Sequence, residues 1–325
     1  MATALPGYLD ELVEGLRRLI PTAIRDNDVD AIHDARVATR RLKAALDLLE
    51  TTIDHRRLRP FARTLRKLRR RLGPLRDLDV MGDHLIELKK DATDDQQKAI
   101  AWLEIRLQNA RKLSVHDARD SAPPGKMLAK LGTWWGVRDD ITAAADVTNS
   151  LLTDSLARQL ATFSRESNRL ISPEPAADQL NPHAIRIAGK SLRYTLEMAR
   201  VQGFDFDGDV FKSFKQMQDA LGLWHDFIVL TERMLAISGG EQLAHHDAPT
   251  QRAILGLAQV TLRKSEDQLD RFAQLWTERG PAISDAIARV ATDRAASALQ
   301  TDLDPSGSTR TADPAAQASD APEAA

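Results

Sequence analysis

The chain of 325 residues contains no cysteine. This absence excludes disulfide scaffolds, zinc sites with thiolate ligands, iron–sulfur clusters and cysteine nucleophiles. Apolar runs of about 18 residues, the length that a membrane span needs, are absent from the sequence as well. The first residues also lack the basic and then apolar layout of a signal peptide. We therefore expect a cytoplasmic protein that has no membrane partner.

The sequence also lacks the pattern of β-strands, which is a run of alternating β-branched residues bounded by turns. Apolar residues instead recur at three- and four-residue spacing almost throughout, which predicts an all-α protein. Helices are expected near residues 9–20, 35–49, 65–72, 76–90, 94–114, 126–138, 147–171, 182–202, 209–221, 224–237, 249–278 and 281–299. Gly73-Pro74 is expected to end a helix, because glycine permits a left-handed turn and proline cannot continue the helix.

Charge is distributed unevenly, although the formal net charge is only −2. Between His33 and Arg76, fourteen basic residues stand against four acidic ones, so this segment carries +10 and the rest of the chain −12. Salt screens charges over about 8 Å under physiological conditions, so a ligand meets the local patch rather than the average. Too few acids lie nearby in the sequence to neutralise these bases. Acids distant in the sequence remain an alternative source of neutralisation.

An internal repeat organises the chain. Residues 33–48 and 183–198 share the pattern H-x-x-R-[VI]-A-x-[RK]-x-L-[KR]-x-x-L-[DE]-[LM]. The motif L-G-x-x-[RH]-D follows each copy and ends at Asp77 and at Asp226. Two motifs that recur in the same order at nearly one spacing imply a duplicated helical unit. We interpret both aspartates as caps of the helix that follows.

The duplication divides the chain into two helical halves, residues 1–145 and 146–299. Residues 300–325 contain almost no large apolar side chains, so they cannot bury enough surface to offset the entropy of ordering. We expect a disordered tail there.

Each repeat places one histidine and three cations on a single helix face, within an arc of about 80°. Cations at three- and four-residue spacing repel one another, so such a face destabilises the helix unless an anion neutralises it. The next helix continues this basic face in both units, but less strongly in the second, where Gly208, Lys212, Lys215 and Asp219 correspond to four arginines of the first. Over residues 183–225, six bases stand against five acids, so the first unit is expected to dominate binding of a polyanion.

These repeated segments resemble the CHAD domain, the conserved histidine α-helical domain, over roughly residues 5–299. The resemblance implies two helical bundles related by pseudo-twofold symmetry, with basic helices lining a central surface or pore. It also implies inorganic polyphosphate as the ligand and association with polyphosphate granules. Gly189, a weak helix former, and Asp219 depart from the family pattern and indicate a weaker second half. Many relatives carry a triphosphatase domain with an E-x-E-x-K motif, which this sequence lacks, so we do not extend that activity to it.

The resemblance and the charge pattern together give the candidate polyphosphate-binding residues. Arginine suits this ligand because its planar fork matches two phosphate oxygens. The candidates are His33, Arg36, Arg40, Arg41, Lys43, Arg59, Arg63, Arg66, Lys67, Arg70, His183, Arg186, Lys190, Arg193, Lys212 and Lys215. Whether the two repeated histidines contact phosphate or support the helices stays open. We expect neither a cofactor nor a resident metal, and no catalytic constellation stands out.

Other functions remain as alternatives. A nucleic-acid-binding protein would use the same charges, and competition between polyphosphate and RNA would separate the two. A metal-dependent polyphosphate-processing enzyme would release phosphate when Mg²⁺ or Mn²⁺ is added. A scaffold would bind acidic partner proteins. The sequence indicates neither the oligomeric state nor a preferred polyphosphate length.

Overall fold

The computed structural model describes residues 4–172, 181–240 and 247–303. Within these ranges the chain is helical apart from short connections, which confirms the all-α prediction. The helices are α1 (Ala4–Pro21), α2 (Val29–Leu48), α3 (His55–Leu88), α4 (Asp94–Ser121), α5 (Pro124–Leu131), α6 (Trp134–Ala143), α7 (Ala145–Leu170), α8 (Pro182–Val201), α9 (Gly208–Ser238) and α11 (Ala248–Leu303), with short turns η1 (Thr22–Asp26), η2 (Glu50–Thr52) and η3 (Lys89–Asp91). The expected tail lies outside the described residues from residue 304 onward. Over the described ranges, no helix is both long and apolar enough to cross a membrane.

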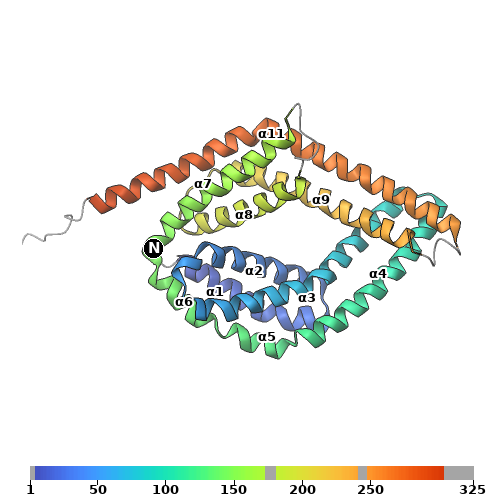
Figure 1. Ribbon diagram of the computed structural model, residues 1–325, viewed down its shortest axis with the longest axis horizontal. Coiled ribbons are helices and arrows are strands. Elements are labelled where there is room, and N and C mark those ends of the chain that lie inside the picture. Colours follow the sequence, from blue (N-terminus) through green and yellow to red (C-terminus); the bar gives the residue numbers. More distant parts are fainter. Residues whose placement is uncertain (1–3, 173–180, 241–246, 304–325) are drawn as a thin grey trace, which may run out of the picture.

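The order of the helices follows the duplicated motifs. Helices α2 and α3 carry the first copy, and α8 and α9 carry the second. The two helix pairs lie opposite each other across the middle of the molecule (Figure 1), where α2 contacts α8 and α3 contacts α9. Helix α1 packs on α2 as α7 packs on α8, and α4 packs on α3 as α11 packs on α9. The repeated basic segments, 150 residues apart in the sequence, are thus brought together.

Two hydrophobic cores hold this arrangement. The larger one combines the apolar faces of both halves and extends along α3 as far as Leu75 and along α9 as far as Leu221. The smaller one joins the ends of α3 and α9 to α4 and α11, and it begins at Met81 on α3 and at Leu230 on α9. Between the cores, α3 and α9 carry polar residues, including both aspartates of the repeated motif. The gap between the cores therefore positions a polar site.

The predicted helix end at Gly73-Pro74 is wrong, because α3 continues from His55 to Leu88. Helix α9 likewise continues through residues 221–224, and α11 continues through Pro281. The expected helix over residues 126–138 is instead split between α5 and α6. A proline costs a helix one hydrogen bond, and burial of α3 in one core before Pro74 and in the other after it offsets that cost.

The predicted caps are wrong for the same reason. Asp77 and Asp226 lie inside α3 and α9, far from any helix start. Their side chains are therefore available for a different role, and both line the same cavity.

Candidate anion-binding site

Both repeats contribute to one cavity of about 300 Å³, here called the central cavity. Its wall comes from α2, α3, α8 and α9 and brings four arginines, two histidines and two carboxylates into one space. The lining residues are His33, Arg36, Val37, Arg40, Arg76, Asp77, Val80, Met81, Arg186, His225, Asp226 and Val229. Motifs about 150 residues apart in the sequence therefore converge on one site.

Contacts with α3 fix the position of Arg36 in this wall. Its Nη1 donates a hydrogen bond to the backbone oxygen of Arg69 at 3.3 Å, and its Nη2 lies 3.6 Å from Oδ1 of Asp77. The guanidinium lies directly over Gly73, where a Cβ atom would stand 2.8 Å from Nη1. Because Gly73 has no side chain, the guanidinium of Arg36 can lie against α3 at this point. This close contact explains why a glycine occurs inside the helix.

The second repeat supplies groups with open bonding capacity. Nε of Arg186 is buried and has no hydrogen-bond partner among the described residues. The side chain of Asp226 has no hydrogen bond or ion pair with the described residues; burial raises its pKa, although Arg186 and His84 nearby oppose the shift. The ring of His225 stands 5.7 Å from the ring of His183. These unsatisfied groups leave room for a polar ligand in the central cavity.

The electrostatics of the cavity reflect crowded positive charge. Burial, with Arg186 and Arg40 nearby, lowers the pKa of Lys190 from 10.5 to about 7. Burial and the adjacent Arg186 also lower the pKa of His225 from 6.5 to about 4. Both shifts disfavour the cationic form, first because burial removes water from these groups and second because other cations lie close to them. An anion bound in the cavity would favour the cationic forms of Lys190 and His225 again.

A second cavity of about 410 Å³, here called the lateral groove, lies between the C-terminal half of α2 and the first part of α3. It is lined by Lys43, Leu46, Asp47, Arg59, Ala62, Arg63, Leu65, Arg66 and Arg69. Lys43 forms an ion pair with Asp47, whereas no ion pair at Arg59, Arg63 or Arg66 is present in the described ranges. Arg69 joins the two cavities, because its side chain lines the groove and its carbonyl accepts from Arg36 of the central cavity.

Other candidates do not line either cavity. Arg41 and Arg193 bind the same carboxylate, with Nε atoms at 2.8 Å and 3.1 Å from Glu197, and the first of these ion pairs joins α2 to α8. An acid distant in the sequence thus neutralises Arg41, the alternative that the sequence left open. The remaining candidates that line neither cavity are Lys67, Arg70, His183, Lys190, Lys212 and Lys215.

Sequence reasoning missed several lining residues. Arg76, Asp77, His225 and Asp226 belong to the repeated L-G-x-x-[RH]-D motif, so the repetition itself was a usable signal. This signal was not used, because the two aspartates were interpreted as helix caps. Arg69 was missed because its position in the lateral groove depends on how α2 and α3 pair.

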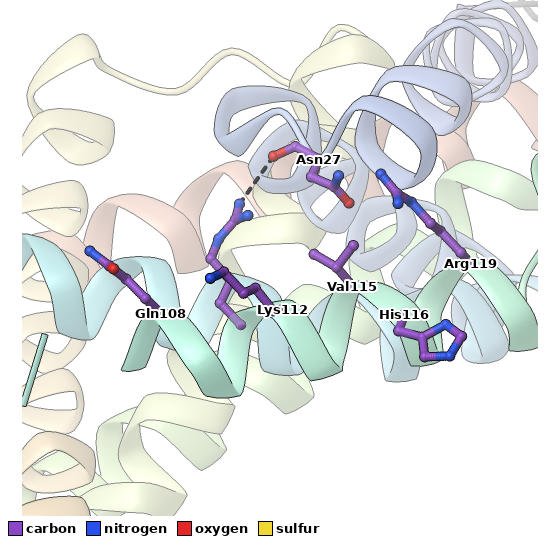
Figure 2. Close-up of a pocket in the computed structure, with 7 residues that line it drawn as sticks. Asn27, Gln108, Lys112, Val115, His116 and Arg119 are labelled. Carbon is purple, nitrogen blue, oxygen red and sulfur yellow. Dashed lines mark hydrogen bonds between the residues drawn. The ribbon is translucent and has the colours of Figure 1, made fainter. Parts of the chain in front are cut away.

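A third cavity, of about 540 Å³, lies between η1 and α4 (Figure 2). Nη2 of Arg111 donates to the backbone oxygen of Asn27 at 3.0 Å, and Arg119 donates to the carbonyls of Ile24 and Arg25. These bonds satisfy carbonyls that the end of η1 leaves without helical donors, so both arginines serve the fold. Over the described part of the chain, no group of three or more His, Asp or Glu side chains is placed to hold a metal ion.

Comparison with known proteins gives one family. The family model described as the CHAD domain matches residues 7–235. The structure of the CHAD domain from the plant Ricinus communis superposes with a TM-score of 0.61 and 19% identity, covering 85% of this chain and 91% of that one. PptA from Streptomyces chartreusis superposes with a TM-score of 0.63 and 19% identity, covering 85% of this chain and 99% of that one. At such identity the likeness concerns the fold. No curated protein sequence matches the chain.

Proposed function

The chain belongs to the CHAD domain family, and on that premise we propose that it binds inorganic polyphosphate through the central cavity and the lateral groove, without converting it chemically. The observation that carries the proposal is the junction of these two cavities on one pair of helices. Together they present cations that the described carboxylates leave largely unneutralised. Binding to long chains would bring the protein to polyphosphate granules.

The spacing of the cations suits a linear polyanion. Polyphosphate carries about one negative charge per phosphate, and it needs a rigid row of donors rather than a single pocket. Arg59, Arg63 and Arg66 are exposed along one face of α3 at three- and four-residue spacing, so they stand about one helical turn, roughly 5.4 Å, apart. Arginine forks at this interval contact successive parts of an extended anion with two hydrogen bonds each.

The lining residues also favour polyphosphate over single-stranded nucleic acid. Binding of bases depends on stacking against Phe, Tyr or Trp side chains. Neither cavity has such a side chain in its lining, which consists of basic, acidic, histidine and small or aliphatic residues. An inorganic chain has no base to stack, so it loses nothing by their absence.

A comparison of two double variants at pH 6 tests the proposal, because Lys190, with a pKa of about 7, is protonated there and both variants then remove two cations. Arg36→Ala with Arg40→Ala removes two side chains of the central cavity. Lys190→Ala with Arg193→Ala removes one cation outside both cavities and one that is paired with Glu197. Isothermal titration with polyphosphate is expected to show a loss of about a hundredfold for the first variant and less than tenfold for the second.

Equal losses in the two variants would show that net charge alone attracts the ligand, and the site assignment would be wrong. Absence of binding to the wild type at low salt would refute the function itself. An excess of RNA over polyphosphate in phosphate units is expected to leave most of the polyphosphate bound. Complete displacement by RNA would favour the nucleic-acid alternative.

A further inference from the structure

Two carboxylates stand where a polyanion is proposed to bind. Asp77 and Asp226 occupy corresponding positions in the two copies of the repeat, and they reach the central cavity from α3 and α9. Neither caps a helix. A carboxylate beside a phosphate oxygen repels it unless a proton lies between them, so a site for the interior of the polyanion gains nothing from these residues. Arg36 faces Asp77 and Arg186 lies near Asp226, and a ligand group that donates a proton can use the bonding capacity that remains on these carboxylates.

The lateral groove shows what a purely anion-binding lining looks like on the same helices. Its carboxylate, Asp47, is already neutralised by Lys43. In the central cavity, Asp77 is ion-paired as well, with Arg36 at 3.6 Å, and the side chains of Asp77 and Asp47 are similarly exposed, at 58% and 60%. The difference is Asp226, a partly buried carboxylate that has no ion pair with another described residue, although Arg186 lies near it. The central cavity thus offers one unpaired acceptor beside its cations, which the groove does not.

The two kinds of phosphate in a linear polyphosphate differ in the same respect. An interior phosphate has a single strongly acidic oxygen, which is ionised at neutral pH and carries no proton. A terminal phosphate has a second acidic hydroxyl, with a pKa of about 6 as in phosphate monoesters. At pH 6 and below, half or more of these hydroxyls keep their proton and can donate a hydrogen bond to a carboxylate, while the remaining terminal oxygens accept from arginine. A chain end therefore matches a cavity that contains both carboxylates and guanidinium groups.

We propose that the central cavity binds the terminal phosphate of a polyphosphate chain, whose hydroxyl donates to Asp77 or Asp226, and that the lateral groove binds the phosphates that follow. This proposal rests on the proposed function and adds the part of the ligand that each cavity takes. Along α2, the step from Arg40 in the cavity to Lys43 in the groove is three residues, or about 4.5 Å. A chain that leaves the cavity therefore enters the groove directly.

Polyphosphate with blocked ends tests the proposal. A short linear chain is compared with the same chain after both ends have been converted to phosphoramidates, which removes the terminal hydroxyl and keeps the interior. For the wild-type protein, titration calorimetry at pH 6 or below is expected to show at least tenfold weaker binding of the blocked chain. Equal affinity for the two chains would overturn end recognition and leave polyphosphate binding intact. Failure of both chains to bind would instead refute the proposed function.

Matched variants identify the groups that recognise the end. Asp77→Asn together with Asp226→Asn is expected to bind the free and blocked chains equally, because an amide no longer accepts the proton as a carboxylate does. Asp47→Asn is the control, since it removes a carboxylate from the neighbouring groove, and it is expected to keep the preference for free ends. A preference that persists in the double variant would contradict the assignment to these two aspartates. The comparison of the two chains on the wild type stands even if the double variant is unstable.

Discussion

Gly73 offers a way to move one arginine of the central cavity without removing any charge. In Gly73→Ala, the new Cβ would stand 2.8 Å from Nη1 of Arg36, so the guanidinium must leave its place on α3. The displaced side chain loses its hydrogen bond to the carbonyl of Arg69 and its ion pair with Asp77. Gly222, at the corresponding position of the second repeat, has no atom within 4 Å of such a Cβ, so Gly222→Ala is the matched control.

The structure predicts little change in the stability of Gly73→Ala but a clear loss of its affinity for polyphosphate. Alanine is favoured over glycine inside a helix by about 1 kcal/mol, and loss of the Arg36 hydrogen bond costs about 1 kcal/mol. The free energy of unfolding of Gly73→Ala is therefore expected to change by less than about 1 kcal/mol. Loss of a charge-assisted hydrogen bond to phosphate costs about 1.5 kcal/mol, which lowers affinity for polyphosphate about tenfold.

Urea denaturation and titration calorimetry on the two variants measure both quantities. Gly222→Ala is expected to bind polyphosphate as the wild type does and to be stabilised by up to about 1 kcal/mol. Wild-type affinity in Gly73→Ala would refute the role of Arg36 in the central cavity. An equal loss of affinity in both variants would show that the glycines act through the helix backbone and not through the arginine.

Two further predictions concern α8. Gly189→Ala would place a Cβ against Gln218 and 2.9 Å from Phe163, both buried, so denaturation is expected to show a loss of stability of about 2 kcal/mol; unchanged stability would contradict the packing of α8. Burial, together with Arg186, Arg40 and Arg36 and against the opposing effect of Asp226, lowers the pKa of Lys190 from 10.5 in the unfolded chain to about 7, so between these pH values the unfolded chain holds a proton that the folded protein does not. Wild-type stability is therefore expected to rise relative to Lys190→Met as pH increases from about 7 toward 10.5, and a constant difference across this range would contradict the shift.

Helical periodicity was sufficient to predict the fold class and the basic faces of α2 and α8, because both depend on spacing within one helix. Whether a helix ends at a glycine or a proline could not be predicted in this way. Gly73-Pro74 reads as a helix end locally, and only the two cores on either side of it show why α3 continues. Gly189 reads as a weakness, yet it marks the place where α8 packs closely on Gln218 and Phe163.

Which residues belong to the site depends even more on tertiary contacts. Arg36 and Arg41 lie on the same helix, and the sequence analysis gives both as candidate ligands although they stand about 140° apart around the helix axis. The structure directs Arg36 to the central cavity and Arg41 to Glu197 of α8. Which cations stay available for a ligand thus depends on acids far away in the sequence, and no local pattern carries that information.

The most direct test of the account is the affinity for polyphosphate of several lengths, measured at about 50 mM and about 200 mM salt. Binding through four or five phosphate contacts releases the counterions of those phosphates. The affinity is therefore expected to fall about a hundredfold from the lower to the higher salt concentration. Affinity is also expected to rise with chain length until the central cavity and the lateral groove are both filled, and then to level off. No binding at the lower salt concentration, or an affinity unaffected by salt, would contradict the claim that these cations hold a linear polyanion.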